Sequence, residues 1–161
     1  MLRAIPKGWL SSNFKILEND VEIAELNFKF ASEEVNIEIQ GIDYKFEPRE
    51  TYFSGGSYVI ESNNSVLAVA ERPGMLGEAF SFVLGEKQYQ LRPESGWSLK
   101  FILLEGEQEV GAIYPEGVFS SRAIAELPAD ISLPVKVFIL WLVVLLWKRD
   151  ADTAAIVAAT I

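Results

Sequence analysis

The sequence of 161 residues contains no cysteine and no histidine. The absence of cysteine excludes a disulfide framework, a thiolate nucleophile and a cysteine-ligated zinc site. The absence of histidine excludes a Ser-His-Asp triad, an imidazole metal site and any side chain whose unperturbed pKa lies near neutrality. No other catalytic constellation stands out among the carboxylates, lysines and hydroxyl groups. We therefore expect a protein without enzymatic activity and without a cofactor.

Positive charge is also scarce, since 14 Lys and Arg residues oppose 23 Asp and Glu residues and give a net charge of −9. An acidic chain does not attract nucleic acid or anionic lipid by its overall field, so neither is expected as a partner. The segment Met1–Leu10 has two basic residues but lacks the apolar run of a signal peptide. This favours a cytoplasmic location, and membrane association stays open.

Hydrophobic residues make up 50% of the chain, which is ample for a core and fits one domain over residues 1–161. Two neighbouring segments, Val35–Gln40 and Ile42–Glu47, alternate apolar and polar side chains, as strands with one buried face do. Gly41 lies between them, where a tight turn is needed. Pro48 is expected to end the second strand because it removes a ladder donor.

Similar short runs recur through residues 1–130 and are separated by turn residues. Such spacing predicts many short antiparallel strands in a sandwich or barrel. The further predicted strands are Phe14–Leu17, Val21–Phe30, Ser57–Ile60, Val66–Glu71, Ala79–Leu84, Gln88–Leu91, Leu99–Leu104, Val110–Tyr114 and Val118–Leu127.

A faint internal repeat accompanies these strands. Gly41–Pro48 is echoed by Gly85–Pro93, and the turns at Glu18–Val21, Glu61–Val66 and Glu105–Val110 each bracket polar residues. One interpretation is three copies of a strand-rich unit, or about a dozen strands. The alternative is that hairpins alone produce the similarity.

The last part of the chain predicts a central helix over residues 132–150, followed by an Ala-rich tail over 151–161 that continues as helix or frays. Ser132 is a plausible N-cap and Pro134 suits the first turn. Val137–Trp147 contains no polar side chain except the Trp indoles, so the helix must be surrounded on every face by lipid or by protein.

Two observations bear on the medium around this helix. The run is about 17 Å long as a helix, against a hydrocarbon core of about 30 Å, which favours burial in protein. Trp147 beside Lys148 and Arg149 is typical of a membrane interface, which favours lipid. Burial in protein requires a wide barrel, and about a dozen strands would supply one. We therefore predict a mainly β fold, a roughly twelve-stranded antiparallel barrel enclosing the C-terminal hydrophobic helix.

This arrangement resembles the tubby C-terminal-like superfamily, which includes tubby proteins, LURP-one-related proteins and phospholipid scramblases. The residues that carry the resemblance are Phe14–Val21, the strand Ile42–Phe46 and the helix Val137–Trp147. The resemblance implies a barrel of about twelve strands around a central helix. Tubby proteins bind phosphoinositides through basic side chains, and the sequence has no matching Lys/Arg cluster. Scramblases are associated with an acidic calcium-binding segment, and Glu18–Glu22 lacks the spacing of a calcium loop.

The candidate contact residues for a lipid or another ligand are Trp141, Trp147, Lys148 and Arg149, with core packing as the alternative for the two Trp side chains. Other polar segments are interpreted as solvated turns, loops or chance motifs. They are Glu105–Glu109, Glu47 with Glu50, Arg72–Leu76 and Asn63–Ser65.

We expect a non-enzymatic binding or scaffold domain that is lipid- or membrane-associated or binds a protein. The alternative is a membrane-anchored protein that uses residues 131–147 as a short transmembrane or interfacial helix.

Overall fold

The computed structural model describes residues 1–8, 13–28, 32–49, 56–72, 79–96, 98–117 and 121–160, with residues 152–160 as helical backbone only. Twelve strands form one sheet in the order β3-β2-β1-β12-β11-β10-β9-β8-β7-β6-β5-β4, and neighbouring strands in this order pair antiparallel. The strands are β1 (Leu2–Pro6), β2 (Asn13–Glu18), β3 (Val21–Asn27), β4 (Val35–Ile39), β5 (Ile42–Arg49), β6 (Ser57–Ser62), β7 (Ser65–Glu71), β8 (Phe80–Leu84), β9 (Lys87–Pro93), β10 (Phe101–Glu105), β11 (Gln108–Pro115) and β12 (Ala123–Glu126).

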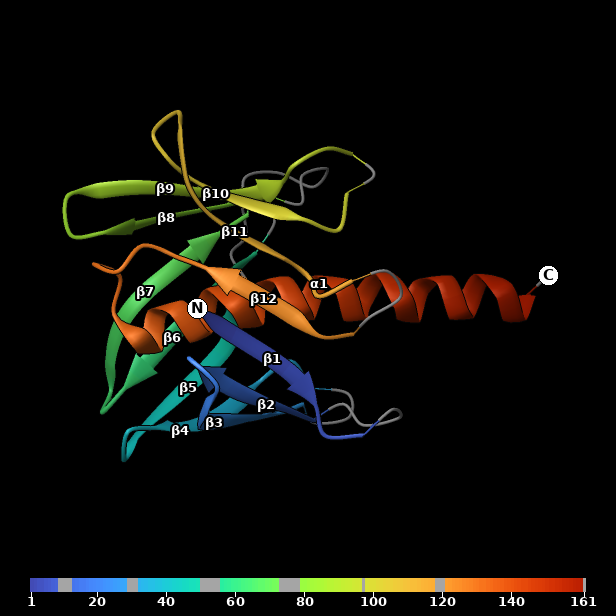
Figure 1. Ribbon diagram of the computed structural model, residues 1–161, viewed down its shortest axis with the longest axis horizontal. Coiled ribbons are helices and arrows are strands. Elements are labelled where there is room, and N and C mark those ends of the chain that lie inside the picture. Colours follow the sequence, from blue (N-terminus) through green and yellow to red (C-terminus); the bar gives the residue numbers. More distant parts are fainter. Residues whose placement is uncertain are drawn as a thin grey trace.

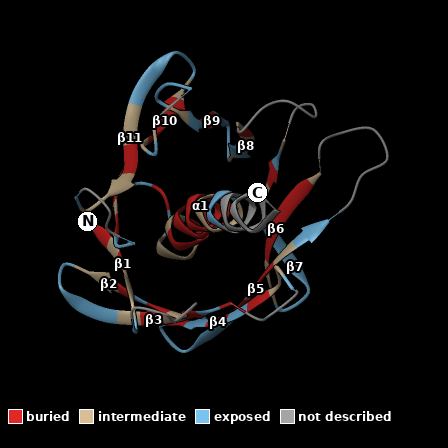
Figure 2. Ribbon diagram, turned by 90° about the vertical axis from the view of Figure 1, so that its right-hand side faces the viewer, coloured by how far each residue is buried: buried red, intermediate tan, exposed pale blue. Residues whose placement is uncertain are grey.

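The sheet curls into a nearly closed barrel around helix α1 (Leu133–Thr160), as Figures 1 and 2 show. The two end strands, β3 and β4, are neighbours in space, but no backbone pairing joins them in the described residues. Every helix side chain from Val137 to Leu146 is buried, in most cases completely. The prediction of a barrel enclosing the apolar helix is therefore confirmed, and protein is the medium around the helix in this structure.

Helix α1 begins one residue after the predicted start and extends beyond the predicted end. Ser132 precedes the first turn, and its carbonyl accepts a hydrogen bond from Lys136 N at 2.9 Å. Of the two alternatives left open for the Ala-rich tail, the backbone adopts the first: the helix continues to Thr160, as the high helix propensity of alanine favours. Figure 1 shows the helix running past the ends of the strands. Among the described residues, no helix is both long enough and apolar enough to cross a membrane.

Other predictions of strand positions need correction. β5 does not end before Pro48 but continues to Arg49, because the pairing of β5 with β4 stops at Phe46 and Pro48 lies where the strand is paired on one side only. Strand β1 (Leu2–Pro6) was not predicted, although it joins β2 to β12 and so makes the twelve strands one continuous sheet. The predicted strand Val118–Leu127 is shorter, and residues 118–120 of it lie outside the described part.

Strand registers support the internal repeat. Three hairpins, β2–β3, β6–β7 and β10–β11, carry a register shift at Ile16, Ile60 and Leu103, which are 44 and 43 positions apart. The strand before each of these hairpins carries a proline at its last or next-to-last position, opposite an aromatic residue. These pairs are Pro6 with Phe14, Pro48 with Tyr58, and Pro93 with Phe101. β1 thus lies before the hairpin β2–β3 in the place that β5 occupies before β6–β7 and β9 occupies before β10–β11.

The equivalent junctions between units differ in closure. At the β11–β12 junction, four residue pairs run from Ala112 with Glu126 to Pro115 with Ala123. Gly111 makes this approach possible, because a Cβ there would lie 2.6 Å from the Glu126 carbonyl oxygen. At the β7–β8 junction, the place of Gly111 is taken by Ala68, and Glu71 with Ser81 is the single pair between the described residues of these strands. This junction is therefore open along most of its length.

The core around the helix is aromatic on the side of β5, β6 and β8. Trp141 is fully buried, and its ring centroid lies 5.4 Å from that of Phe46, 5.6 Å from Tyr58 and 5.8 Å from Phe138. Its indole N–H has no hydrogen-bond partner within the described residues. Trp141 is therefore a packing residue that leaves one buried donor unsatisfied.

We expect Trp141→Ala to lower the free energy of unfolding by about 3–5 kcal/mol, because it leaves a large cavity. Trp141→Phe should lower it by less than about 1.5 kcal/mol, because removal of the unpaired donor offsets part of the lost packing. Denaturant unfolding of both variants measures the difference. Equal losses for the two variants would contradict this assignment of the indole N–H.

We expect Gly111→Ala to lower the free energy of unfolding by about 1–3 kcal/mol, because the added methyl group must displace the backbone of β12. Gly96→Ala is the matched control, since nothing lies within 4 Å of a Cβ at Gly96. Thermal unfolding of the two variants tests the close approach, and similar midpoints for both would argue against it.

Candidate functional site

The end of the barrel where the helix leaves gathers side chains from distant parts of the chain. Trp147 donates its indole N–H to the carbonyl oxygen of Leu99 at 3.0 Å. The ammonium of Lys148 lies 5.0 Å from the ring centroid of Phe28. Arg149 donates Nε to Glu33 Oε1 at 2.6 Å, and a second guanidinium nitrogen bonds the same oxygen. We call these residues the exit collar; they are Phe28, Glu33, Leu99, Trp147, Lys148 and Arg149.

Tyr58 extends the polar part of the collar toward the core. Its hydroxyl donates to Glu33 Oε2 at 3.2 Å, and the Arg149 guanidinium carbon lies 5.8 Å from its ring centroid. Burial raises the pKa of Tyr58, so the hydroxyl stays protonated and able to donate. Burial lowers the pKa of Arg149. The hydrogen bond to Glu33, together with the electrostatic interactions with Tyr58 and Glu33, outweighs burial, so the net effect raises this pKa. Glu33 therefore accepts from both neighbours and anchors the helix where it leaves the barrel.

The structure separates the four predicted contact residues. Trp141 lies in the core, whereas Trp147, Lys148 and Arg149 are half-buried in the exit collar. Sequence reasoning missed Phe28, Glu33 and Leu99, which come from the β3–β4 and β9–β10 connections. No local signal could have found them, because their role depends on which loops meet the end of the helix.

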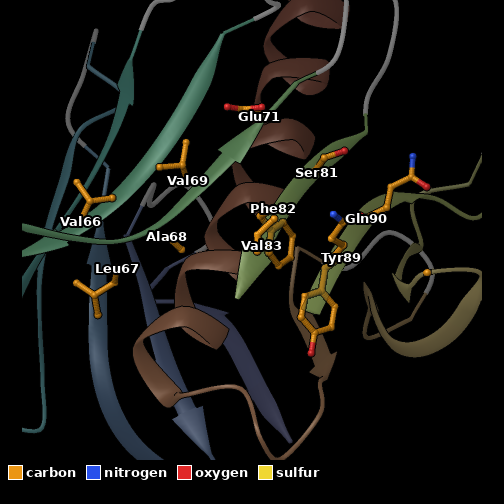
Figure 3. A pocket seen from close by; sticks show the side chains of 12 residues that line it. Val66, Leu67, Ala68, Val69, Glu71, Ser81, Phe82, Val83, Tyr89 and Gln90 are labelled. Carbon is orange, nitrogen blue, oxygen red and sulfur yellow. The ribbon is translucent and has the colours of Figure 1, made fainter. Parts of the chain in front are cut away.

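The open β7–β8 junction forms a second candidate site, a groove of about 780 Å³ (Figure 3). Phe82 and Ala68 on its floor are buried, while Val83 is 56% and Leu67 40% exposed at its edges. A smaller hollow of about 410 Å³ shares Leu67 and Tyr89 with the groove and reaches residues 130–132 before the helix. We call the larger groove the β7–β8 slot. Sequence reasoning did not predict it.

Other acidic candidates lie apart from these sites. Glu105, Glu107 and Glu109 belong to the β10–β11 hairpin, where Glu105 pairs with Lys87 at 3.6 Å. Within the described ranges, no group of three or more acidic side chains is arranged to hold a metal ion. Asn63 and Asn64 form the tip of the β6–β7 hairpin with positive φ angles. Glu50 and residues 73–76 lie outside the described residues.

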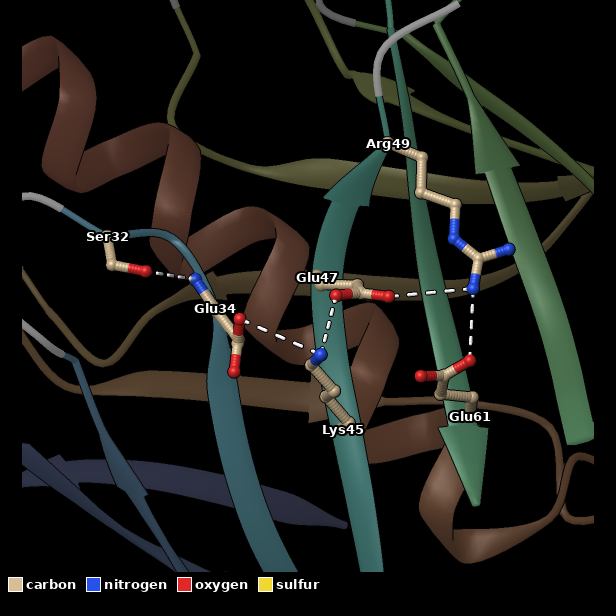
Figure 4. Close-up of polar contacts among 6 residues, drawn as sticks. All are labelled: Ser32, Glu34, Lys45, Glu47, Arg49 and Glu61. Carbon is tan, nitrogen blue, oxygen red and sulfur yellow. Dashed lines mark hydrogen bonds and ion pairs between the residues drawn. The ribbon is translucent and has the colours of Figure 1, made fainter. Parts of the chain in front are cut away.

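Glu47 belongs to a network of ion pairs on the outer face of β4, β5 and β6 (Figure 4). Lys45 Nζ lies 2.9 Å from Glu47, and Arg49 bridges Glu47 to Glu61 at 3.5 and 3.0 Å. The hydrogen bond from Lys45, together with the charges of Lys45 and Arg49, lowers the pKa of Glu47 against the effect of burial. The network is therefore structural and holds neighbouring strands together.

Since the pKa of Glu47 is lower in the folded chain, its contribution to stability is present above its ordinary pKa of 4.5 and is lost as the pH falls through the folded value. We expect Glu47→Gln to reduce stability by at most about 1 kcal/mol at pH 7 and to flatten the loss of stability below pH 4.5. Glu38→Gln, which removes a carboxylate without an ion pair among the described residues, is the control. Thermal midpoints of both variants across pH 3–7 measure these effects. If the two variants lost stability identically below pH 4.5, the stabilising role of the Glu47 carboxylate would be refuted.

Three comparisons with known proteins were made. No family model matches the chain, and no curated protein and no solved structure matches it either. The resemblance to the tubby C-terminal-like superfamily stays a prediction.

Proposed function

We propose that this chain is a non-enzymatic binding domain that attaches to membrane surfaces through the end of the barrel where the helix leaves. The exit collar is the observation that carries the proposal. It combines an indole, two cationic side chains and Leu99, which is 56% exposed. Such side chains place their apolar bodies at the edge of the hydrocarbon and their polar ends among headgroups.

The continuation of the helix supports the same end of the molecule. The helical backbone extends to Thr160, past the ends of the strands. In sequence, no charged residue follows Asp152. Ala, Ile, Val and Thr, the residue types that make up 153–161, carry no charge that would oppose contact with apolar lipid.

The connecting segments at this end carry large apolar residues beside charged ones in sequence. Each odd-numbered strand is joined to the next strand here, and part of each connection lies outside the described residues. In sequence alone, those parts contain several large apolar residues. They are Trp9, Leu10, Phe30, Tyr52, Phe53, Met75, Leu76, Trp97 and Phe119.

The opposite end of the barrel has a different character. Its hairpin tips consist of polar residues and glycine, many of them with positive φ angles. These tips are Asn19–Asp20, Gln40–Gly41, Asn63–Asn64, Gly85–Glu86 and Gly106–Glu107. Polar tips gain nothing from contact with hydrocarbon, which supports the collar end, although Val21, Ile42 and Val66 beside these tips are exposed.

The collar also predicts how the attachment depends on lipid charge. Lys148 faces a ring and Arg149 is paired with Glu33, so neither cation is fully available to an anionic headgroup. We infer that apolar contact dominates, with weak dependence on salt and on anionic lipid. The alternative, insertion of residues 131–147, requires those side chains to leave the core of the barrel.

Cosedimentation of the full chain with phosphatidylcholine vesicles tests the proposal. We expect binding in both 0.1 M and 0.5 M salt, and a several-fold decrease for Leu99→Asp, because a charge replaces apolar surface at the collar. Val21→Asp is the matched control, since Val21 is 64% exposed at the opposite end of the barrel and should not affect binding.

Three outcomes would contradict the proposal. The first is absence of vesicle binding by the unmodified chain, and the second is an equal loss of binding in the two variants. The third is binding in which the barrel unfolds and residues 131–147 enter the bilayer. The last would be detected by loss of the near-ultraviolet circular dichroism of buried Trp141 and would favour the membrane-anchored alternative.

A further inference from the structure

The β7–β8 slot has unpaired backbone groups on both sides. Successive residues of a strand point their N–H and C=O groups to opposite sides. Arg72 N donates to Gly56 O at 3.0 Å, toward β6, so the backbone groups of Glu71 and Val69 point toward β8. These two residues are therefore the ones that β7 offers to the junction.

The same reasoning applies to β8. Gly106 N donates to Gln88 O at 3.3 Å, on the β10 side of β9, so Tyr89 points toward β8 and bonds its partner Phe82. Alternation then turns Ser81 and Val83 toward β7. Glu71 and Ser81 do pair, but the next pair of the same ladder, Val69 with Val83, is not formed. The N–H and C=O groups of both valines thus face the slot.

The side chains around these groups are apolar on the inner face of the sheet and mixed on the outer face, where Ser81, Gln88 and Gln90 also line the slot. Phe82 and Ala68 are buried on the inner face, and Val66, Leu67 and Val83 are among the exposed large hydrophobic residues of the described chain. Glu71 lies at the narrow end of the slot and makes no ion pair with another described residue. Figure 3 shows these side chains along the two strands.

We propose that the β7–β8 slot binds a short extended peptide with apolar side chains and a basic residue, which pairs its backbone with Val69 and Val83. A peptide strand satisfies the two unpaired valine backbones. Its side chains meet Phe82 and Ala68 on the inner face and Val83 beside Gln88 on the outer face, and its cation faces Glu71. An acyl chain suits the β7–β8 slot less well than a peptide does, because it would cover the same backbone groups and leave them without hydrogen-bond partners. This site is separate from the exit collar.

The equivalent β11–β12 junction shows what the slot lacks. There, Ala112 and Glu126 form the pair that corresponds to Val69 and Val83. The chain fills this position itself at the β11–β12 junction and leaves it open at the β7–β8 junction. The same sheet position is therefore competent for strand pairing.

Selection of a displayed library of seven-residue peptides on the full chain tests the proposal. We expect enrichment of peptides with alternating apolar residues and at least one Lys or Arg. The binding of a selected peptide should weaken at least tenfold in Val83→Pro, which removes an N–H that no strand of the barrel uses. Val83→Ala keeps that N–H and should weaken binding no more than about threefold. Glu71→Gln should weaken binding of the basic peptides.

Amide hydrogen exchange on the unmodified chain gives a second readout that does not depend on how Val83→Pro folds. The amides of Val69 and Val83 should exchange faster than those of Glu71 and Ser81, and the bound peptide should slow them. Failure to enrich any peptide, protection of both valine amides in the free chain, or unaltered binding in a folded Val83→Pro variant would overturn the proposal. So would a concentration-dependent dimer that Val83→Pro abolishes, because the occupant would then be a second copy of the chain.

Discussion

A helix that is apolar around its whole circumference has to be kept from water on every side, and the rest of the structure follows from that requirement. Val137–Leu146 is buried because strands surround it, with no side of the helix left to solvent. A ring wide enough for a helix about 10 Å across needs more strands than a barrel filled by its own side chains. The antiparallel repeat supplies them, and β1 from the other end of the chain completes the ring.

The ring is not uniform, because the side chains facing the helix differ in size. Ala4, Ala123 and Ala125 are buried on β1 and β12, whereas Phe46 and Phe80 occupy the corresponding positions on β5 and β8. Small side chains let β12 lie close to the helix and to β11. β8 carries bulky Phe80 where β12 carries Ala123, and the ladder between the described residues of β7 and β8 consists of one pair. The closed junction and the slot are thus two outcomes of one repeat with different core residues.

Local patterns in the sequence were enough to predict most strands of the barrel and the enclosed helix. Strict alternation in Val35–Gln40 and Ile42–Glu47 identified strands, and the apolar run identified the enclosed helix. Leu2–Pro6 was missed because it is short, ends in proline and pairs with residues more than a hundred positions away. The slot and the loop residues of the collar were missed for a similar reason: both depend on how distant strands and loops meet, which no local pattern records.

Occupation of the interior by the helix also limits where this barrel can act. Barrels of comparable width can hold a ligand or a channel inside, but here Trp141 and its aromatic neighbours fill that space. Recognition must therefore use the ends of the barrel or the edges of its strands. The exit collar is the end at which apolar and cationic side chains meet, and the β7–β8 slot is a strand edge that the fold leaves open. The enclosed helix that stabilises the barrel thus directs binding to its outside.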